Sequence, residues 1–176
     1  MGTDFGDAQN SAVRAFLFHV TKVLKSKSKE SIPMAFNGKE SKEKWENIKK
    51  DFDDRCAYCG DKPEKLTKEH LIMKNRKQGG LDFFGNIVPC CSPCNHKHKK
   101  ETDSTDWTER LKNRLSEKDG LNEHELRLKR IKEYIKKENY PLSPEDNKKI
   151  QEEAEHLYIE IREVIEKYLK VFKEKK

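Results

Sequence analysis

Long hydrophobic runs are missing from this sequence of 176 residues. The longest apolar stretch, AFLFHV at residues 15–20, is far shorter than the roughly 20 residues that a membrane-spanning helix needs. The first ten residues, MGTDFGDAQN, also lack the basic start and apolar core of a secretory signal. We therefore expect a soluble, cytoplasmic protein with no membrane partner.

Hydrophobic residues are scarce, at 33% of the chain against 40% for charged residues. So little apolar material predicts only a modest core, and a small core usually needs help from a metal, disulfides or a partner. The net charge is +6, and half of this basic excess falls in residues 56–103. A basic balance is compatible with a polyanionic partner such as nucleic acid, but it does not establish one.

Four of the five cysteines form two CxxC pairs, Cys56/Cys59 and Cys91/Cys94. In a chain without a secretory signal, such pairs are more typical of metal sites than of disulfides or of buried free thiols. Two residues between thiolates let both reach one tetrahedral Zn²⁺. The pairs therefore predict a four-cysteine structural zinc site that ties the start of this segment to its end. Cys90 competes with Cys91 as a ligand, but its CxxxC spacing is the less usual one.

The pattern of apolar residues predicts a mostly helical chain with a small mixed segment in its middle. The helices are expected over residues 8–27, 42–54, 105–118, 123–139 and from Pro144 toward the C-terminus. Two short strand candidates, within residues 65–73 and 81–89, precede a further helix that begins near Ser92. This is a compact, local ββα order.

The last predicted helix carries a long apolar stripe. Its apolar residues alternate spacings of four and three, which is typical of a heptad pattern: Ile150, Ala154, Leu157, Ile161, Val164, Tyr168 and Val171. We expect this stripe to pack in an antiparallel hairpin, with residues 122–139 against 144–173. The alternative is a homodimer through the C-terminal helices.

The segment that holds the cysteine pairs resembles the HNH endonucleases, which are ββα-metal nucleases with a zinc-stapled core. The resemblance rests on LTKEHLIMKNRKQGG and GNIVPCCSPCN, which contain an acid–His pair, a GG and an NLVP-like stretch before CxxC and Asn. It covers residues 56–95, about a quarter of the chain. It departs from the family at Glu69, where Asp is usual, at Met73, where Pro is common, and at Asn95, where the name-giving motif has His.

The resemblance implies a role for each matching residue. His70 is then the general base that takes a proton from the attacking water. Asn86 is the central Asn that holds the loop after the histidine strand. Glu69 and Asn95 are ligands of the catalytic metal, with His98 as a further candidate. Carboxylate and amide oxygens suit Mg²⁺ or Mn²⁺. Taken alone, His70 could also be a hydrogen-bonded strand histidine, and Asn95 a helix cap.

Basic residues flank this site and are candidates for contacts with the backbone phosphates of nucleic acid. They are Lys74, Arg76, Lys77, Lys97, Lys99 and Lys100. Any one of them could equally be an ordinary surface residue.

The predicted fold class is α+β, mostly α. A zinc-bound ββα-metal core over residues 56–103 is flanked by an N-terminal helical region, 1–55, and by a C-terminal helical region, 104–176. The implied function is a metal-dependent HNH endonuclease that hydrolyses DNA, with RNA as an open alternative, and family habit suggests a setting in restriction or phage defence. The rival hypotheses are a non-catalytic zinc module that binds nucleic acid and a helical interaction protein with the zinc site as scaffold.

Overall fold

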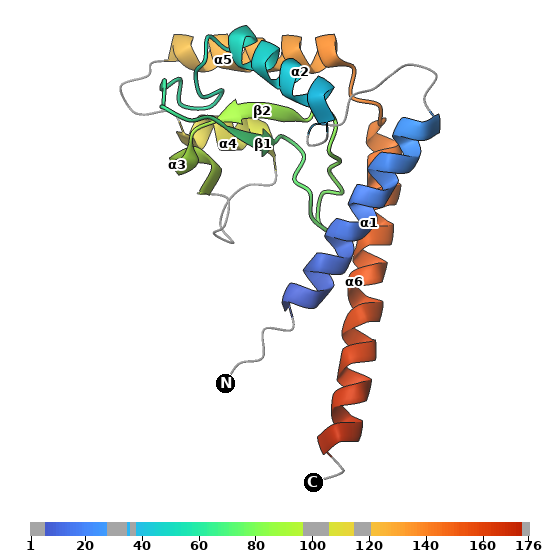
Figure 1. Cartoon of the computed structure of the whole chain (residues 1–176). Coiled ribbons are helices and arrows are strands. Elements are labelled where there is room, and N and C mark those ends of the chain that lie inside the picture. Colours follow the sequence, from blue (N-terminus) through green and yellow to red (C-terminus); the bar gives the residue numbers. More distant parts are fainter. Residues whose placement is uncertain (1–5, 28–34, 36–37, 97–105, 115–120, 174–176) are drawn as a thin grey trace.

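The computed structural model describes residues 6–27, 35, 38–96, 106–114 and 121–173. It shows a head, in which several helices surround a small sheet, and an arm of two long helices that extends away from the head (Figure 1). The arm consists of α1 (Gly6–Lys27) and α6 (Pro144–Lys173). This arrangement confirms the predicted α+β, mostly helical class.

The sheet lies in the middle of the head and has two antiparallel strands. β1 (Thr67–His70) pairs with β2 (Ile87–Cys90), so that His70 lies opposite Ile87. α3 (Ser92–His96) follows β2 directly and packs against β1. The ββα order predicted from the sequence is therefore present.

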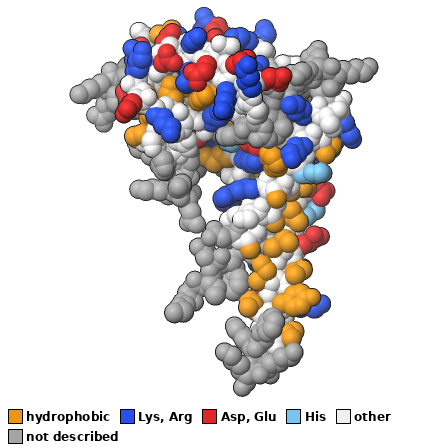
Figure 2. Space-filling model, in the orientation of Figure 1, with side chains coloured by type: hydrophobic (Ala, Val, Ile, Leu, Met, Phe, Trp, Pro, Cys, Tyr) orange, Lys and Arg blue, Asp and Glu red, His pale blue; other side chains and the backbone are white. Residues whose placement is uncertain are grey.

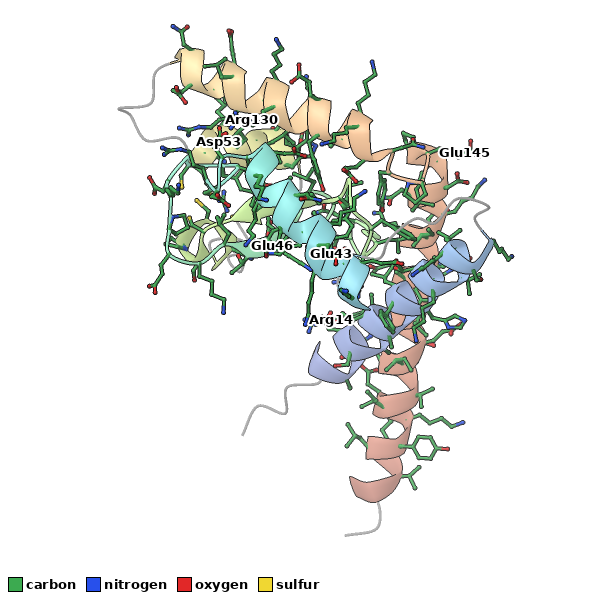
Figure 3. The ribbon with its side chains drawn as sticks, turned by 45° about the horizontal axis from the view of Figure 1, so that its top comes forward. Arg14, Glu43, Glu46, Asp53, Arg130 and Glu145 are labelled. Atoms are coloured by element: carbon green, nitrogen blue, oxygen red, sulfur yellow. The ribbon has the colours of Figure 1, made fainter. Side chains whose placement is uncertain are left out.

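Three further helices complete the head, namely α2 (Gly38–Asp51), α4 (Trp107–Arg114) and α5 (Leu121–Glu138). Each places apolar side chains on one face, as helical spacing requires. These side chains form one core with both strands, and Ile48, Phe52, Leu111, Ile131 and Tyr134 are among its buried members. An ion pair of 2.8 Å between Asp53 and Arg130 links the end of α2 to α5 at the surface (Figure 3).

The arm has its own apolar cluster. Val13 and Leu17 of α1 are buried together with Ala154 of α6, and Leu81 and Phe83 of the head reach into the same cluster. The cluster therefore joins the arm to the head.

The first turn of α6 is capped, since the Asp146 backbone N–H donates to the Ser143 hydroxyl oxygen at 3.1 Å.

The predicted hairpin between residues 122–139 and 144–173 is not formed. α5 lies across the head, the chain turns after Glu138, and α6 packs along α1 instead (Figure 1). The apolar stripe on α6 predicts that this face packs against another helix, but it does not specify which helix. α5 uses its own apolar face, with Ile131 and Tyr134, to close the core of the head. α1 then covers the first half of the stripe.

The distal half of α6 keeps an exposed apolar face, visible as orange side chains in Figure 2. Val164 is 50% exposed, Tyr168 60% and Val171 43%. Homodimerisation through this stretch stays a prediction. None of the helices in the described ranges combines the length and the apolar character needed to cross a membrane.

Candidate active site

Four of the five cysteines meet at the start of α3. The Sγ atoms of Cys56, Cys59, Cys91 and Cys94 all lie within 4.8 Å of one another. Sulfurs that surround a tetrahedral zinc at about 2.3 Å are about 3.8 Å apart, and the Sγ atoms of Cys59 and Cys91 are 3.6 Å apart. The cluster therefore fits a zinc ion, and Cys91 rather than Cys90 completes it.

Backbone hydrogen bonds shape each cysteine pair into a tight turn. The Gly60 N–H donates to the Cys56 carbonyl at 2.9 Å, and the Asn95 N–H donates to the Cys91 carbonyl at 3.0 Å. Gly60 has a φ of 75°, which glycine adopts without steric cost. The Ala57 N–H donates to the carbonyl of residue 89 at 2.8 Å and joins the first turn to β2. Local bonds thus shape each cysteine pair, and the bond to β2 brings the two pairs together.

The crowding of these thiols also favours a bound cation. Hydrogen bonds from neighbouring thiols, that of Cys59 first, lower the pKa of Cys56. The hydrogen bond with Cys56 in turn raises the pKa of the Cys59 and Cys94 thiols. The four sulfurs thus compete for protons in a shared space, and a bound zinc would remove this competition because it deprotonates the thiols that coordinate it.

His70, the last residue of β1, pairs with a buried aspartate. Its Nε2 lies 3.0 Å from Oδ1 of Asp82, whose side chain is 4% exposed. Burial alone raises the pKa of Asp82, but hydrogen bonds from His70 and Lys74 outweigh it and hold this pKa below its usual value. An ionised carboxylate only accepts hydrogen bonds, so Nε2 carries the proton of the neutral ring. The basic lone pair then belongs to Nδ1.

Asp82 is held in place by the arm and by the segment before α2. Its backbone N–H donates to the Thr21 hydroxyl of α1 at 3.4 Å, and its carbonyl accepts from the Ala35 N–H at 2.8 Å. Sequence reasoning missed Asp82, because a single acid in GGLDFF has no spacing that marks it as a histidine partner. Its role depends on contacts between residues that are far apart in the chain.

Asn86 closes the loop that follows β1. Its Oδ1 accepts from the Ile72 N–H at 2.7 Å, and its Nδ2 donates to the carbonyls of Ile72 at 2.9 Å and Leu81 at 3.0 Å. The side chain is buried, so all of its hydrogen-bonding capacity has to be met within the protein, and these three bonds meet it. The residue matched to the central Asn therefore ties together both ends of the loop that carries Asp82.

Two glycines make the same loop compact. Gly79 has a φ of 64°, which most other residues avoid. A Cβ on Gly80 would lie 1.9 Å from the Ile72 carbonyl oxygen, closer than atoms can approach. The GG of the sequence pattern therefore reflects a turn at one position and a close backbone approach at the next.

Tyrosines from the C-terminal helical region clamp this loop from outside. The Leu81 N–H donates to the Tyr140 hydroxyl at 3.2 Å, and the Gly85 N–H donates to the Tyr134 hydroxyl at 3.1 Å. Every residue from Gln78 to Cys91 is buried. The flanking helices are thus part of the structure that positions His70.

The two candidate metal ligands belong to the other face of β1. Side chains of a strand alternate between faces, so Glu69 shares its face with Thr67 and not with His70. The Asn95 amide nitrogen donates to the Thr67 hydroxyl at 2.8 Å, which places Asn95 on that face. Glu69 is buried there, at 6% exposure. The face that holds both residues carries carboxylate and amide oxygens, the donors that Mg²⁺ or Mn²⁺ prefers.

A buried arginine, Arg110 of α4, supports the end of β1. It has 0% exposure, and its guanidinium donates to the carbonyls of His70 at 3.0 Å and Leu71 at 2.7 Å. Arg114, one turn later, donates to the Cys94 carbonyl at 3.2 Å. α4 therefore braces the histidine strand and the zinc site together. In sequence, the mixed charges of WTERLKNR give no sign that either arginine is buried.

The predicted phosphate-contacting residues have different environments. Lys74 pairs with Asp82, and Arg76 pairs with Glu155 of α6 at 2.7 Å, so both are engaged within the chain. Lys77 is exposed at the surface of the loop. Lys97, Lys99, Lys100 and the candidate ligand His98 lie outside the described residues.

The segment that holds the zinc cluster and the His70 site matches a known family model, described as HNH endonuclease, over residues 56–101. This segment is an HNH domain. It covers about a quarter of the chain and confirms the predicted resemblance. No curated protein and no solved structure matches the chain. An HNH domain supports a nuclease-type or nucleic-acid-binding module, and its cysteine cluster supports zinc binding.

Replacing Asn86 with alanine is expected to lower the free energy of unfolding by about 2–4 kcal/mol, because three backbone groups of a mostly buried loop lose their partner. Urea unfolding followed by circular dichroism measures the change. Asn47→Ala is the matched control, since Asn47 is exposed on α2 and its loss should change the free energy by about 0.5 kcal/mol or less. Equal effects of the two substitutions would contradict the role of Asn86 in closing the loop.

Proposed function

We propose that the chain is a metal-dependent HNH endonuclease that hydrolyses phosphodiester bonds of DNA, with His70 as the general base. The observation that carries this proposal is the 3.0 Å pairing of His70 with buried Asp82 inside the HNH domain. The pairing assigns the ring proton to Nε2 and the basic lone pair to Nδ1, which is the arrangement that a histidine base requires. Restriction or phage defence is the setting that family habit suggests.

The proposed reaction is a direct hydrolysis. His70 Nδ1 removes a proton from water as the water oxygen attacks phosphorus and a new P–O bond forms. The bond from phosphorus to the 3′ oxygen breaks, and this oxygen takes a proton from solvent. The products are a 3′-hydroxyl and a 5′-phosphate. Asp82 keeps the ring oriented and stabilises the imidazolium that forms, as a carboxylate does in other histidine pairs.

Glu69 and Asn95 are the proposed holders of the catalytic divalent ion, on the face of β1 described above. Such an ion polarises the phosphate and offsets the charge that develops on the leaving oxygen. The Asn95 amide nitrogen is engaged with Thr67, so the amide presents its oxygen as the ligand atom. Glu69 and His70 are adjacent in the chain but lie on opposite faces of β1. We propose that the phosphate to be cleaved binds at the end of this strand, where groups from both faces can reach it.

Cleavage by the zinc-loaded protein tests the proposal. We expect supercoiled plasmid to be nicked or linearised only when Mg²⁺ or Mn²⁺ is added, and to yield ends that a DNA ligase can rejoin. Linear duplex, single-stranded DNA and RNA run in parallel identify the substrate class. If none of these is cut with any divalent ion while the protein still binds DNA, the non-catalytic zinc module is the correct function.

Asp82→Asn is expected to lower kcat by about tenfold to a hundredfold with little change in KM, because an amide no longer fixes the ring tautomer or stabilises the imidazolium. Steady-state cleavage of a fluorescent duplex measures both constants. Asp54→Asn is a suitable control, because Asp54 is exposed and asparagine tolerates its φ of 53°. A fall in kcat that simply follows the loss of folded protein would argue against a positioning role.

A further inference from the structure

We propose that α1, which lies outside the HNH domain, is the surface on which the phosphate backbone of the DNA substrate docks beside His70. This inference rests on the proposed function and adds to it the element that holds the substrate. The surface consists of Arg14, Phe18, Lys22 and Lys25, and we call it the α1 basic face.

The charge of α1 differs from that of the rest of the chain. From Ala8 to Lys27 the sequence contains no Asp or Glu, although 32 of the 176 residues are acidic. The same stretch contains Arg14, Lys22, Lys25 and Lys27. α2, α5 and α6 each mix several acids with their basic residues. With Asp7 at its start, α1 carries one acid against four basic residues, and it is therefore a predominantly basic helix in a chain of mixed charge.

Among the residues that the structure describes, the cations of α1 also lack the carboxylate partners that cations on the other helices have. Within the described part of the chain, none of them lies within ion-pair distance of a carboxylate. On the other helices such pairs are common, as in Lys39–Glu43, Lys44–Glu138, Lys49–Glu46, Arg127–Glu123, Arg130–Asp53, Lys148–Glu152 and Lys149–Glu145. Unpaired exposed cations on one helix face generate a positive potential that attracts a polyanion.

The α1 basic face lies next to the candidate catalytic histidine. Thr21 of α1 accepts the hydrogen bond from the Asp82 N–H. Lys74, which pairs with Asp82, has its Nζ 5.3 Å from the Phe18 ring centroid, and Lys22 Nζ lies 4.7 Å from the same centroid. A continuous row of contacts thus leads from His70 through Asp82 and Lys74 to the basic face.

The shape of this face suits a phosphate backbone. Arg14, Phe18 and Lys22 are one turn apart, so they project from the same side of the helix. That side faces away from α6, as the direction of Arg14 in Figure 3 shows, and Figure 2 shows Lys and Arg side chains at the inner corner between head and arm. Arg14 and Lys22 are separated by about 12 Å along the axis, or three to four base-pair steps of duplex DNA.

Binding of DNA to a His70→Ala protein tests this inference without cleavage. A fluorescein-labelled duplex is titrated with zinc-loaded full-length protein in buffer without Mg²⁺, and anisotropy gives Kd at several salt concentrations. Arg14→Gln/Lys22→Gln in this background is expected to raise Kd about tenfold. It should also reduce the slope of log Kd against log salt by about two, because two phosphate contacts are lost.

Lys148→Gln/Lys149→Gln is the matched control, since it removes the same charge from exposed positions on α6. It should leave Kd within about twofold and the slope unchanged. Thermal unfolding confirms that both variants are folded, which is expected because Arg14 and Lys22 are exposed. Equal Kd and slope for the α1 variant and its parent would overturn the inference, and so would equal losses in the two double variants.

The Arg14→Gln/Lys22→Gln variant is also assayed for DNA cleavage in a chain that retains His70. This assay separates the present inference from the proposed function. If the unmodified chain cuts DNA and the α1 variant cuts it with unchanged kcat/KM, the docking surface is wrong and the enzyme stands. If the unmodified chain cuts nothing but the α1 variant loses duplex binding, the enzyme is wrong and the docking surface stands.

Discussion

Replacing His70 with alanine is expected to lower the rate of DNA cleavage by about two to four orders of magnitude, the usual contribution of a general base. Folding should change little, because His70 is only partly buried and Asp82 keeps its pairing with Lys74. DNA binding should also persist, since the substitution removes no cation. The measurement is single-turnover cleavage of a labelled duplex at saturating protein, beside a thermal unfolding curve.

His156→Ala provides the control for this substitution, because His156 is exposed on α6 and far from the HNH domain in sequence. It should cut DNA at the rate of the unmodified chain. Free imidazole added to the His70→Ala protein should restore part of the lost rate, which a purely structural histidine would not show. Cleavage by the His70→Ala protein at an undiminished rate would remove His70 as the base.

The second large effect concerns the zinc cluster. Replacing Cys94 with alanine is expected to abolish zinc binding and to leave the head unfolded. A structural zinc contributes about 10 kcal/mol or more to folding in small metal-bound domains, which is comparable to the whole free energy of unfolding of a typical domain. Zinc content by elemental analysis and thermal unfolding of the purified protein measure the two parts of this expectation.

Cys90→Ala separates loss of a ligand from loss of a buried cysteine. Cys90 has 0% exposure and its Sγ lies 3.9 Å from that of Cys56, but it is not a member of the four-sulfur cluster. Its replacement should keep one zinc per chain and lower stability by on the order of 1 kcal/mol. If the Cys90 variant lost zinc and the Cys94 variant kept it, the ligand set would have to be reassigned.

The parts of the site that the sequence predicts correctly are those built from neighbouring residues. The CxxC spacing by itself specifies two tight turns, because two intervening residues fit a single turn around one metal. The acid–His pair, the GG and the central Asn occupy one strand and one loop, so their order in the chain largely determines their order in space. The two cysteine turns and the ββα order therefore follow from local spacing, whereas the meeting of the two turns also needs the bond from Ala57 to β2.

The parts that the sequence does not reveal are contacts between distant segments. Asp82 has the appearance of an ordinary loop residue, and only the fold brings it to His70. Arg110 lies among charged residues of α4, and its burial depends on how that helix lies against β1. The apolar stripe of α6 predicts a covered face correctly, but it cannot distinguish α5 from α1 as the covering helix, since both offer apolar residues at helical spacing.

The hydrogen bonds from the loop after β1 to Tyr134 and Tyr140 determine whether this domain can be moved into another protein by engineering. A segment cut at the limits of the family match would expose Leu81 and Phe83, which now pack against the arm. It would also leave the Leu81 and Gly85 amides without their hydroxyl partners. The HNH segment is consequently not expected to fold when it is excised. A fusion protein or a shortened chain would have to include the arm and the segment that carries Tyr134 and Tyr140.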